Sequence, residues 1–104
     1  MRIPGWLLRQ TVTLEPYRGE SAYGPVYGDP VELRCRIEAR RRLVRDRQGR
    51  EVVADAQAWF APEDEVTITP ESRLTWAGRT YTVLEARPMP GPNGRTHHVE
   101  VMLG

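Results

Sequence analysis

The side chains that could bind a metal ion are few in this chain, and their spacing is poor. Its two histidines, His97 and His98, are adjacent. Because neighbouring side chains on a strand point to opposite faces, we do not expect this pair to share one metal ion. Three consecutive acids also splay apart, and they lack the alternating positions and glycine bend of a calcium loop. The sequence therefore predicts no metal site, and a solvated turn at Glu63, Asp64 and Glu65.

The sequence is equally poor in candidate nucleophiles. Cys35 is the only cysteine, so neither an intramolecular disulfide nor a cysteine-based zinc cluster can form within one chain. It sits in an alternating apolar stretch, which predicts a small core residue rather than a nucleophile. No nucleophile-elbow, phosphate-loop or dinucleotide-binding motif occurs. We therefore expect a protein that is not an enzyme and needs no cofactor.

Charge is unevenly distributed, although the formal net charge is only +1. All fifteen basic residues are arginine. Residues 31–50 hold eight arginines against three acids (+5), whereas residues 51–75 hold six acids against one arginine (−5). Adjacent segments of opposite sign are typical of a surface that meets a copy of itself, although a solvated hairpin has the same composition. The candidate basic residues are Arg40, Arg41, Arg42, Arg45, Arg47 and Arg50, and the candidate acidic partners are Glu63, Asp64 and Glu65.

Residues 16–30 form the longest stretch without strand alternation. This stretch contains three glycines and three prolines, and it predicts a long irregular loop. Its tyrosines, Tyr17, Tyr23 and Tyr27, offer large contact area at low entropic cost. We expect the loop to be mobile in the free protein and to order on assembly, whereas the alternative is a surface loop with incidental tyrosines.

Strand signals dominate the rest of the chain. The alternation is cleanest at Val31–Ile37, where Val31, Leu33, Cys35 and Ile37 share one face. The other expected strands cover residues 10–15, 51–60, 66–69, 73–76, 79–86 and 96–103. We expect a turn at Ala77-Gly78, a charged hairpin tip at 44–52 and at most one helical turn after Pro62, and residues 1–9 have no clear pattern.

These elements predict an all-β domain of 104 residues: a small antiparallel β-barrel of about six or seven strands with a long loop and a long charged hairpin. The expected core is Val12, Leu14, Leu33, Cys35, Ile37, Trp76, Tyr81, Val83, Val99 and Val101. No apolar run approaches the roughly 18 residues of a membrane helix, and the first eight residues lack the apolar region of a secretory signal. We therefore expect no membrane partner.

The last third of the chain resembles a known family. The segments RLTWAGRTYTV (73–83), PMPGPNG (88–94) and HHVEV (97–101) resemble the recurrent ending of the head-closure proteins of long-tailed bacteriophages, also called stoppers or head–tail connector proteins. The order of features over residues 10–104 is also similar to that family. The arginine content of residues 34–50 departs from it.

The resemblance implies a β-barrel protomer that assembles in the host cytoplasm into a ring within the virion. Such a ring lies below the portal and adaptor proteins, retains the packaged DNA and docks a tail terminator or another tail protein. It implies no catalytic residue or cofactor, and it assigns ring contacts and channel closure to the long loop and the long hairpin. The arginines of that hairpin would then face either DNA in the channel or a neighbouring subunit.

The residues also allow an alternative, a small β-barrel module that binds nucleic acid. Trp59 and Phe60 lie on the return strand near the arginine cluster, as the aromatic platforms of single-strand-binding barrels do. Glu51 and Asp55 on the same arm would repel phosphate. We therefore favour the structural assembly protein.

Overall fold

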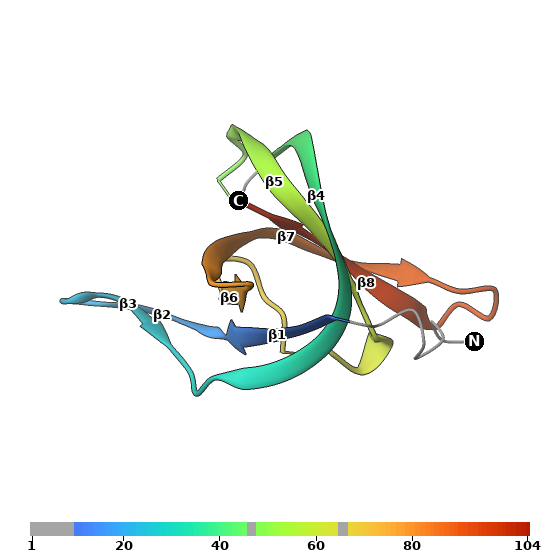
Figure 1. Cartoon of the computed structure of the whole chain (residues 1–104), viewed down its shortest axis with the longest axis horizontal. Helices are drawn as coiled ribbons and strands as arrows, with labels where there is room; N and C mark the ends of the chain where they lie inside the picture. Colours follow the sequence, from blue (N-terminus) through green and yellow to red (C-terminus); the bar gives the residue numbers. More distant parts are fainter. Residues whose placement is uncertain (1–9, 46–47, 65–66) are drawn as a thin grey trace.

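The computed structural model describes residues 10–45, 48–64 and 67–104, and it is almost entirely β (Figure 1). The described strands are β1 (Gln10–Glu15), β2 (Tyr17–Ser21), β3 (Gly24–Tyr27), β4 (Val31–Arg45), β5 (Glu51–Phe60), β6 (Arg73–Trp76), β7 (Arg79–Pro90) and β8 (Thr96–Leu103). One short 3-10 helix, η2 (Pro62–Asp64), follows β5 at the proline that ends this strand. The helical turn expected after Pro62 is therefore present.

Six of these strands close into an antiparallel barrel in the order β1-β4-β5-β8-β7-β6. β1 closes it by pairing with β4 on one side, where Val12 lies opposite Leu33, and with β6 on the other, where Leu14 lies opposite Leu74. Because the barrel is closed, each of the six strands has a paired neighbour on both sides. An open sheet of six strands would leave two edge strands unpaired on one side. The predicted small antiparallel barrel is confirmed.

The barrel is filled by the apolar face of each strand. Eight of the ten predicted core residues are buried, and Leu33 and Trp76 are partly buried against them. Val31 is an exception to the expected alternation, because it lies at the exposed start of β4. The structure adds several buried apolar residues that the sequence analysis did not select: Ala54, Ala56, Ala58, Phe60, Ala61, Ile68, Leu74, Met102 and Leu103.

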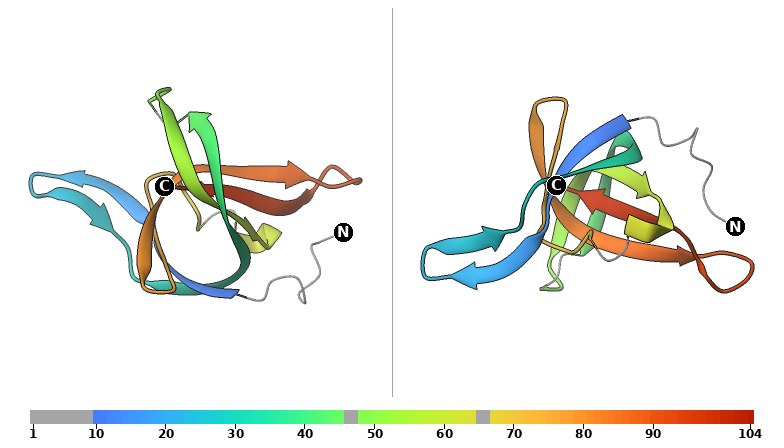
Figure 2. Two further views of the ribbon diagram at one scale, coloured as in Figure 1. Left: turned by 45° about the horizontal axis from the view of Figure 1, so that its top comes forward. Right: turned by 90° about the horizontal axis from the view of Figure 1, so that it is seen from below.

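Strand β4 is much longer than its alternation indicates. Its pairing with β5 shifts between Ala39 and Arg42, so β4 carries one extra residue there. Such a bulge reverses which side chains face the core, which explains why the alternation fades at this point. Beyond the bulge, β4 and β5 continue past the barrel as a projecting hairpin (Figure 2). We call its described residues, 40–45 and 48–54, the arginine arm.

The segment predicted to be a long irregular loop is instead a second projecting hairpin. β2 and β3 pair with each other as a separate two-stranded sheet, and Ser21 lies opposite Gly24 at the end of the hairpin. Gly19 and Gly24 have φ values of 123° and 110°, a region that other residues rarely adopt. The prediction missed the hairpin because these glycines and Pro25 interrupt the alternation that normally marks strands.

Two other predicted elements also differ. The strand expected at 66–69 is wrong for residues 67–69, which are a turn and an irregular segment, and residue 66 lies outside the described residues. β7 continues through Pro88 and Pro90, which the sequence analysis placed in a connection, and β7 and β8 together form a third projecting hairpin (Figure 2). The expected turn at Ala77-Gly78 is present, with positive φ at both residues (51° and 78°). This is the arrangement of a two-residue hairpin turn that follows the strand twist.

Candidate functional site

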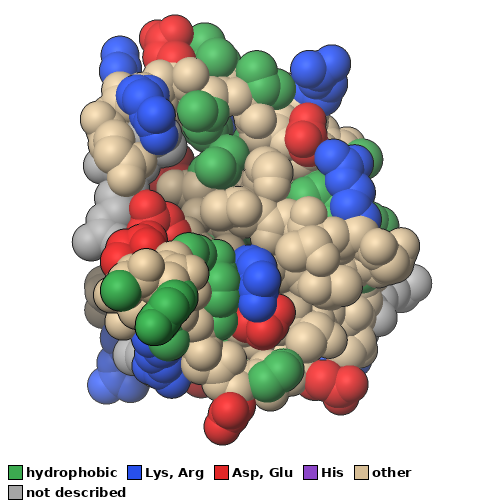
Figure 3. All heavy atoms as spheres, turned by 90° about the vertical axis from the view of Figure 1, so that its left-hand side faces the viewer, with side chains coloured by type: hydrophobic (Ala, Val, Ile, Leu, Met, Phe, Trp, Pro, Cys, Tyr) green, Lys and Arg blue, Asp and Glu red, His purple; other side chains and the backbone are tan. Residues whose placement is uncertain are grey.

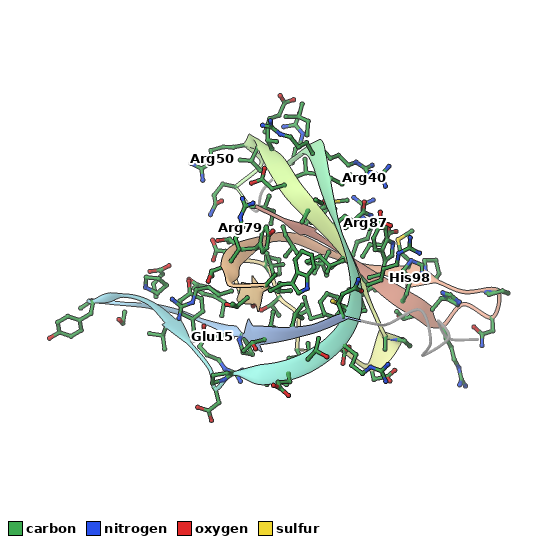
Figure 4. All side chains as sticks on the ribbon, viewed as in Figure 1. Glu15, Arg40, Arg50, Arg79, Arg87 and His98 are labelled. Carbon is green, nitrogen blue, oxygen red and sulfur yellow. The ribbon has the colours of Figure 1, made fainter. Side chains whose placement is uncertain are left out.

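The predicted basic residues gather on the arginine arm. Arg40, Arg41, Arg42 and Arg45 come from β4, and Arg50 precedes β5, whereas Arg47 lies outside the described residues. Figure 4 shows Arg40 and Arg50 on opposite sides of the arm. Arg45 donates to the backbone oxygen of Gly49 (2.8 Å) and lies 3.8 Å from Glu51. Part of the charge of the arm is therefore offset within the arm itself.

A groove runs between the arginine arm and the outer face of strands β7 and β8. Its volume is about 350 Å³. The lining residues are Arg42, Leu43, Val44, Arg45, Glu85, Arg87, Glu100 and Met102. Three arginines and two glutamates share the lining with Leu43, Val44 and Met102, and Arg87 is ion-paired with Glu85. The groove therefore offers both guanidinium faces and apolar side chains.

A buried polar contact joins the arm to the barrel beside this groove. Gln57 on β5 is almost fully buried. Its amide nitrogen donates to Glu100 (2.9 Å), and its amide oxygen accepts from Arg40 (3.4 Å). Because a buried amide without partners is costly, these bonds hold Arg40 and Glu100 in place relative to each other.

The prediction that His97 and His98 point apart is wrong. Their Nδ1 atoms are 2.9 Å apart, and the rings meet edge to face with centroids 5.1 Å apart. The reason is a bulge: Met89 lies opposite His98 and Pro90 opposite Thr96, so His97 is an extra residue that breaks the alternation. His98 Nε2 also lies 3.7 Å from Glu100. Within residues 10–45, 48–64 and 67–104, no group of three or more candidate metal ligands comes together.

The predicted acidic residues lie away from the arm. Glu63 and Asp64 belong to η2, and Glu65 lies outside the described residues. Strand β5 runs from the arginine arm at its start to η2 just beyond its end, so the two groups occupy opposite ends of this strand (Figure 1). Any ion pair between Glu63 and the arm would therefore have to join two molecules.

The three predicted tyrosines do not form one surface. Tyr17 and Tyr27 meet edge to face at the base of the β2–β3 hairpin, with centroids 6.1 Å apart. The guanidinium of Arg73 lies 3.9 Å from the Tyr27 ring centre and 3.0 Å from Glu15, which attaches the hairpin to the barrel. Tyr23, in contrast, is fully exposed at the tip. Two of the tyrosines are therefore anchors, and one is free for contact.

Several residues of the groove were missed by the sequence analysis. Leu43 lies in the segment where alternation fades, and Glu85, Arg87 and Glu100 are unremarkable charges on strands. Only the crossing of the arm over β7 and β8 brings them together. The exposed pair Leu43 and Val53, which face each other across the arm, carried the one available signal: large apolar side chains in a charged segment.

No protein-family model matches this chain, and no curated protein matches it in sequence. Within the described residues, no helix is long and apolar enough to span a membrane.

Proposed function

We propose that this protein is a structural assembly protein that forms a homo-oligomeric ring at the head–tail junction of a long-tailed bacteriophage. In this role it lies below the portal and adaptor, retains packaged DNA and docks a tail protein, as its resemblance to head-closure proteins implies. The proposal combines that resemblance in residues 73–101 with a small barrel that carries projecting hairpins.

The observation that carries the proposal is the exposure of large apolar side chains on two hairpins. Tyr23 is fully exposed on the β2–β3 hairpin, and Leu43 and Val53 of the arginine arm are 62% and 46% exposed. Figure 3 views the molecule from the β2–β3 end and shows hydrophobic side chains on this hairpin and again near the top, among arginines and acids. Apolar side chains with a polar surround are typical of protein–protein contacts.

The separation of charge supports the same role. A basic arm and an acidic turn at opposite ends of β5 suit a head-to-tail contact, in which two different patches meet. Arginine suits such contacts because its planar guanidinium pairs bidentately with carboxylates and is weakly hydrated.

Nucleic-acid binding is the second candidate function. Arg41 and Arg42 take part in no ion pair with any other residue of the chain that the structure describes, so both could contact phosphate. The aromatic residues give less support to nucleic-acid binding. The guanidinium of Arg36 already lies over Trp59, 5.7 Å from its ring centre, and Phe60 is buried in the barrel. The arginine arm thus offers phosphate contacts without an open stacking platform.

The decisive experiment is removal of the gene from the phage genome that carries it. We expect heads that package DNA but lose it, and tails that remain unattached, with both defects corrected by the gene supplied on a plasmid. Light scattering of the protein mixed with rings of the neighbouring adaptor should show a complex of defined mass. Complete, infectious particles without the gene product would refute the proposal, and tight binding to single-stranded DNA without adaptor binding would favour the alternative.

A further inference from the structure

The β2–β3 hairpin lacks the support that the other strands have. It forms its own two-stranded sheet and pairs with no strand of the barrel. Its two ends are joined where Gly28 donates to the Pro16 carbonyl (2.7 Å), and its base is attached to the barrel side where Tyr17 donates its amide hydrogen to Ser72 (2.9 Å) and Arg73 lies over Tyr27. A two-stranded hairpin alone is only marginally stable in water. Its outer half is therefore exposed and packs against nothing in the part of its own molecule that the structure describes.

The tip of this hairpin has the chemistry of an anchor. Tyr23 is fully exposed, and Ala22 and Val26 beside it are also exposed. Residues 19–26 contain one acid, Glu20, and no base. The tip is thus an aromatic and apolar projection with a single negative charge.

The groove beside the arginine arm has the complementary chemistry. Arg42, Arg45 and Arg87 outnumber the glutamates that share the lining, and Leu43 and Met102 supply apolar contact. Its volume of about 350 Å³ is at the lower end of the range of roughly 300–1,000 Å³ for pockets that enclose small organic ligands. A groove of this size has room for one aromatic side chain.

Within the described residues, an arginine guanidinium lies over an aromatic ring at three places. Arg73 lies 3.9 Å from the ring centre of Tyr27, Arg79 lies 4.8 Å from that of Tyr81, and Arg36 lies 5.7 Å from that of Trp59. Guanidinium groups attract aromatic faces because of the ring quadrupole, and the attraction grows when water is excluded. The arginines of the groove would hold a tyrosine ring by this same interaction.

The hairpin and the groove lie on different sides of the barrel. The β2–β3 hairpin projects from one end of the longest axis in Figure 1, whereas the groove residue Arg87 lies on the other side of the barrel in Figure 4. The hairpin therefore points away from its own groove, and only a second molecule can bring a tip to it. A contact between two different patches continues from copy to copy, and it forms a ring where the rotation per subunit closes and an open filament where it does not.

From these observations we propose that the β2–β3 hairpin of one copy docks in the groove of the next copy, with Tyr23 against the arginine side chains and against Leu43 and Met102. This inference deepens the proposed ring function by naming the contact between subunits. It requires self-association only, so it can be tested without a phage.

Disulfide capture tests the contact directly. Ala22→Cys places a thiol beside Tyr23 on the donor copy, and Val53→Cys places one opposite Leu43 on the acceptor copy. The donor thiol is first converted to a mixed disulfide, so that only donor–acceptor pairs can form. The matched control is Arg34→Cys on the acceptor, because Arg34 is exposed on the same strand β4 but lies outside the arm. The native Cys35 is buried and does not compete.

We expect Val53→Cys to be captured at least about tenfold faster than Arg34→Cys, as measured by non-reducing electrophoresis. Adding Tyr23→Ser to the donor, or Leu43→Ser to the acceptor, should slow capture about tenfold, the factor that loss of one anchor residue commonly causes. Tyr23→Phe keeps the ring and should leave the rate nearly unchanged.

Equal capture rates for the two acceptors, or a rate unaffected by Tyr23→Ser, would overturn the inference and leave the groove to a different partner. Failure of this contact can be distinguished from failure of the proposed function. Fast, Tyr23-dependent capture with intact phage assembly in the absence of the gene would support the contact and refute the phage role. Slow capture, together with heads that lose their DNA when the gene is removed, would refute the contact and support the phage role.

Discussion

At the scale of single residues, Cys35 shows how burial in the barrel suppresses the ionisation of a thiol. The side chain is fully buried on β4, and burial, assisted by the negative charge of Asp64, raises the pKa of its thiol to about 12. A thiolate is therefore disfavoured at any physiological pH, and the residue acts as a small apolar core group.

The raised pKa of Cys35 predicts a loss of stability at alkaline pH. Above pH 9 the unfolded chain releases the thiol proton, whereas the folded protein retains it until about pH 12. The free energy of unfolding should therefore fall as the pH rises through this window, and the Cys35→Ala variant should show a smaller fall. Urea unfolding of both proteins at pH 7 and pH 10.5 measures the difference. Parallel pH dependence of the two proteins would contradict the assignment.

The two histidines and Gln57 show where residue-level reasoning was insufficient. His97 and His98 contact each other because a bulge lies between them and their partners on β7. Gln57 is buried although it lies on the outer face of β5, beside Met102 and with Arg40 as a hydrogen-bond partner. Both features depend on strand pairing, which amino-acid type does not reveal.

At the scale of elements, the turn between β6 and β7 illustrates local control by sequence. Ala77 adopts φ 51°, which is strained for a residue with a side chain, and Gly78 follows with φ 78°. Asn-Gly is strongly preferred in this turn because asparagine tolerates positive φ better than alanine does.

We therefore predict that Ala77→Asn stabilises the protein by about 0.5–1 kcal/mol. Gly78→Ala should destabilise it by about 1 kcal/mol, because the side chain is forced into the same strained region. Thermal unfolding monitored by circular dichroism checks both changes. A lower melting temperature for Ala77→Asn would mean that this turn is not strained.

The β2–β3 hairpin and the β4 bulge show the limit of pattern reading for elements. The glycines and Pro25 suppressed the strand signal at Tyr17–Tyr27, and the bulge at Ala39–Arg42 reversed the alternation on β4. In both places the backbone hydrogen bonds of a partner strand maintain the extended conformation against the local pattern.

At the scale of the whole molecule, the separated charges make a prediction for assembly. Arg41 lies on the arm, has no ion pair within the part of the chain that the structure describes, and is available to the acids of a neighbouring copy. If the protein forms the proposed ring, Arg41→Glu should weaken its assembly on adaptor rings in the absence of DNA, more strongly at low salt than at high salt, and Glu63→Arg should partly restore it. Each exposed pair contributes only about 0–1 kcal/mol, so the effect should be severalfold rather than complete.

The matched control is Arg34→Glu, an equal charge reversal on β4 outside the arm. It should leave assembly unchanged. If Arg41→Glu assembles normally and only the retention of packaged DNA fails, the arm faces the DNA channel rather than a neighbouring subunit.

The sequence by itself determined the all-β class, the barrel core and most strand positions. Strand alternation at residues 33–37 and the turn at Ala77-Gly78 are local properties, set by side-chain period and by the backbone freedom of glycine. The tertiary structure alone decided how the barrel closes, where the bulges fall and which charges meet. The groove needs β4 to cross β7 and β8, and Arg42, Arg87 and Glu100 are far apart in the chain. Strand pairing over such separations depends on the whole set of packed side chains, so no local pattern contains it.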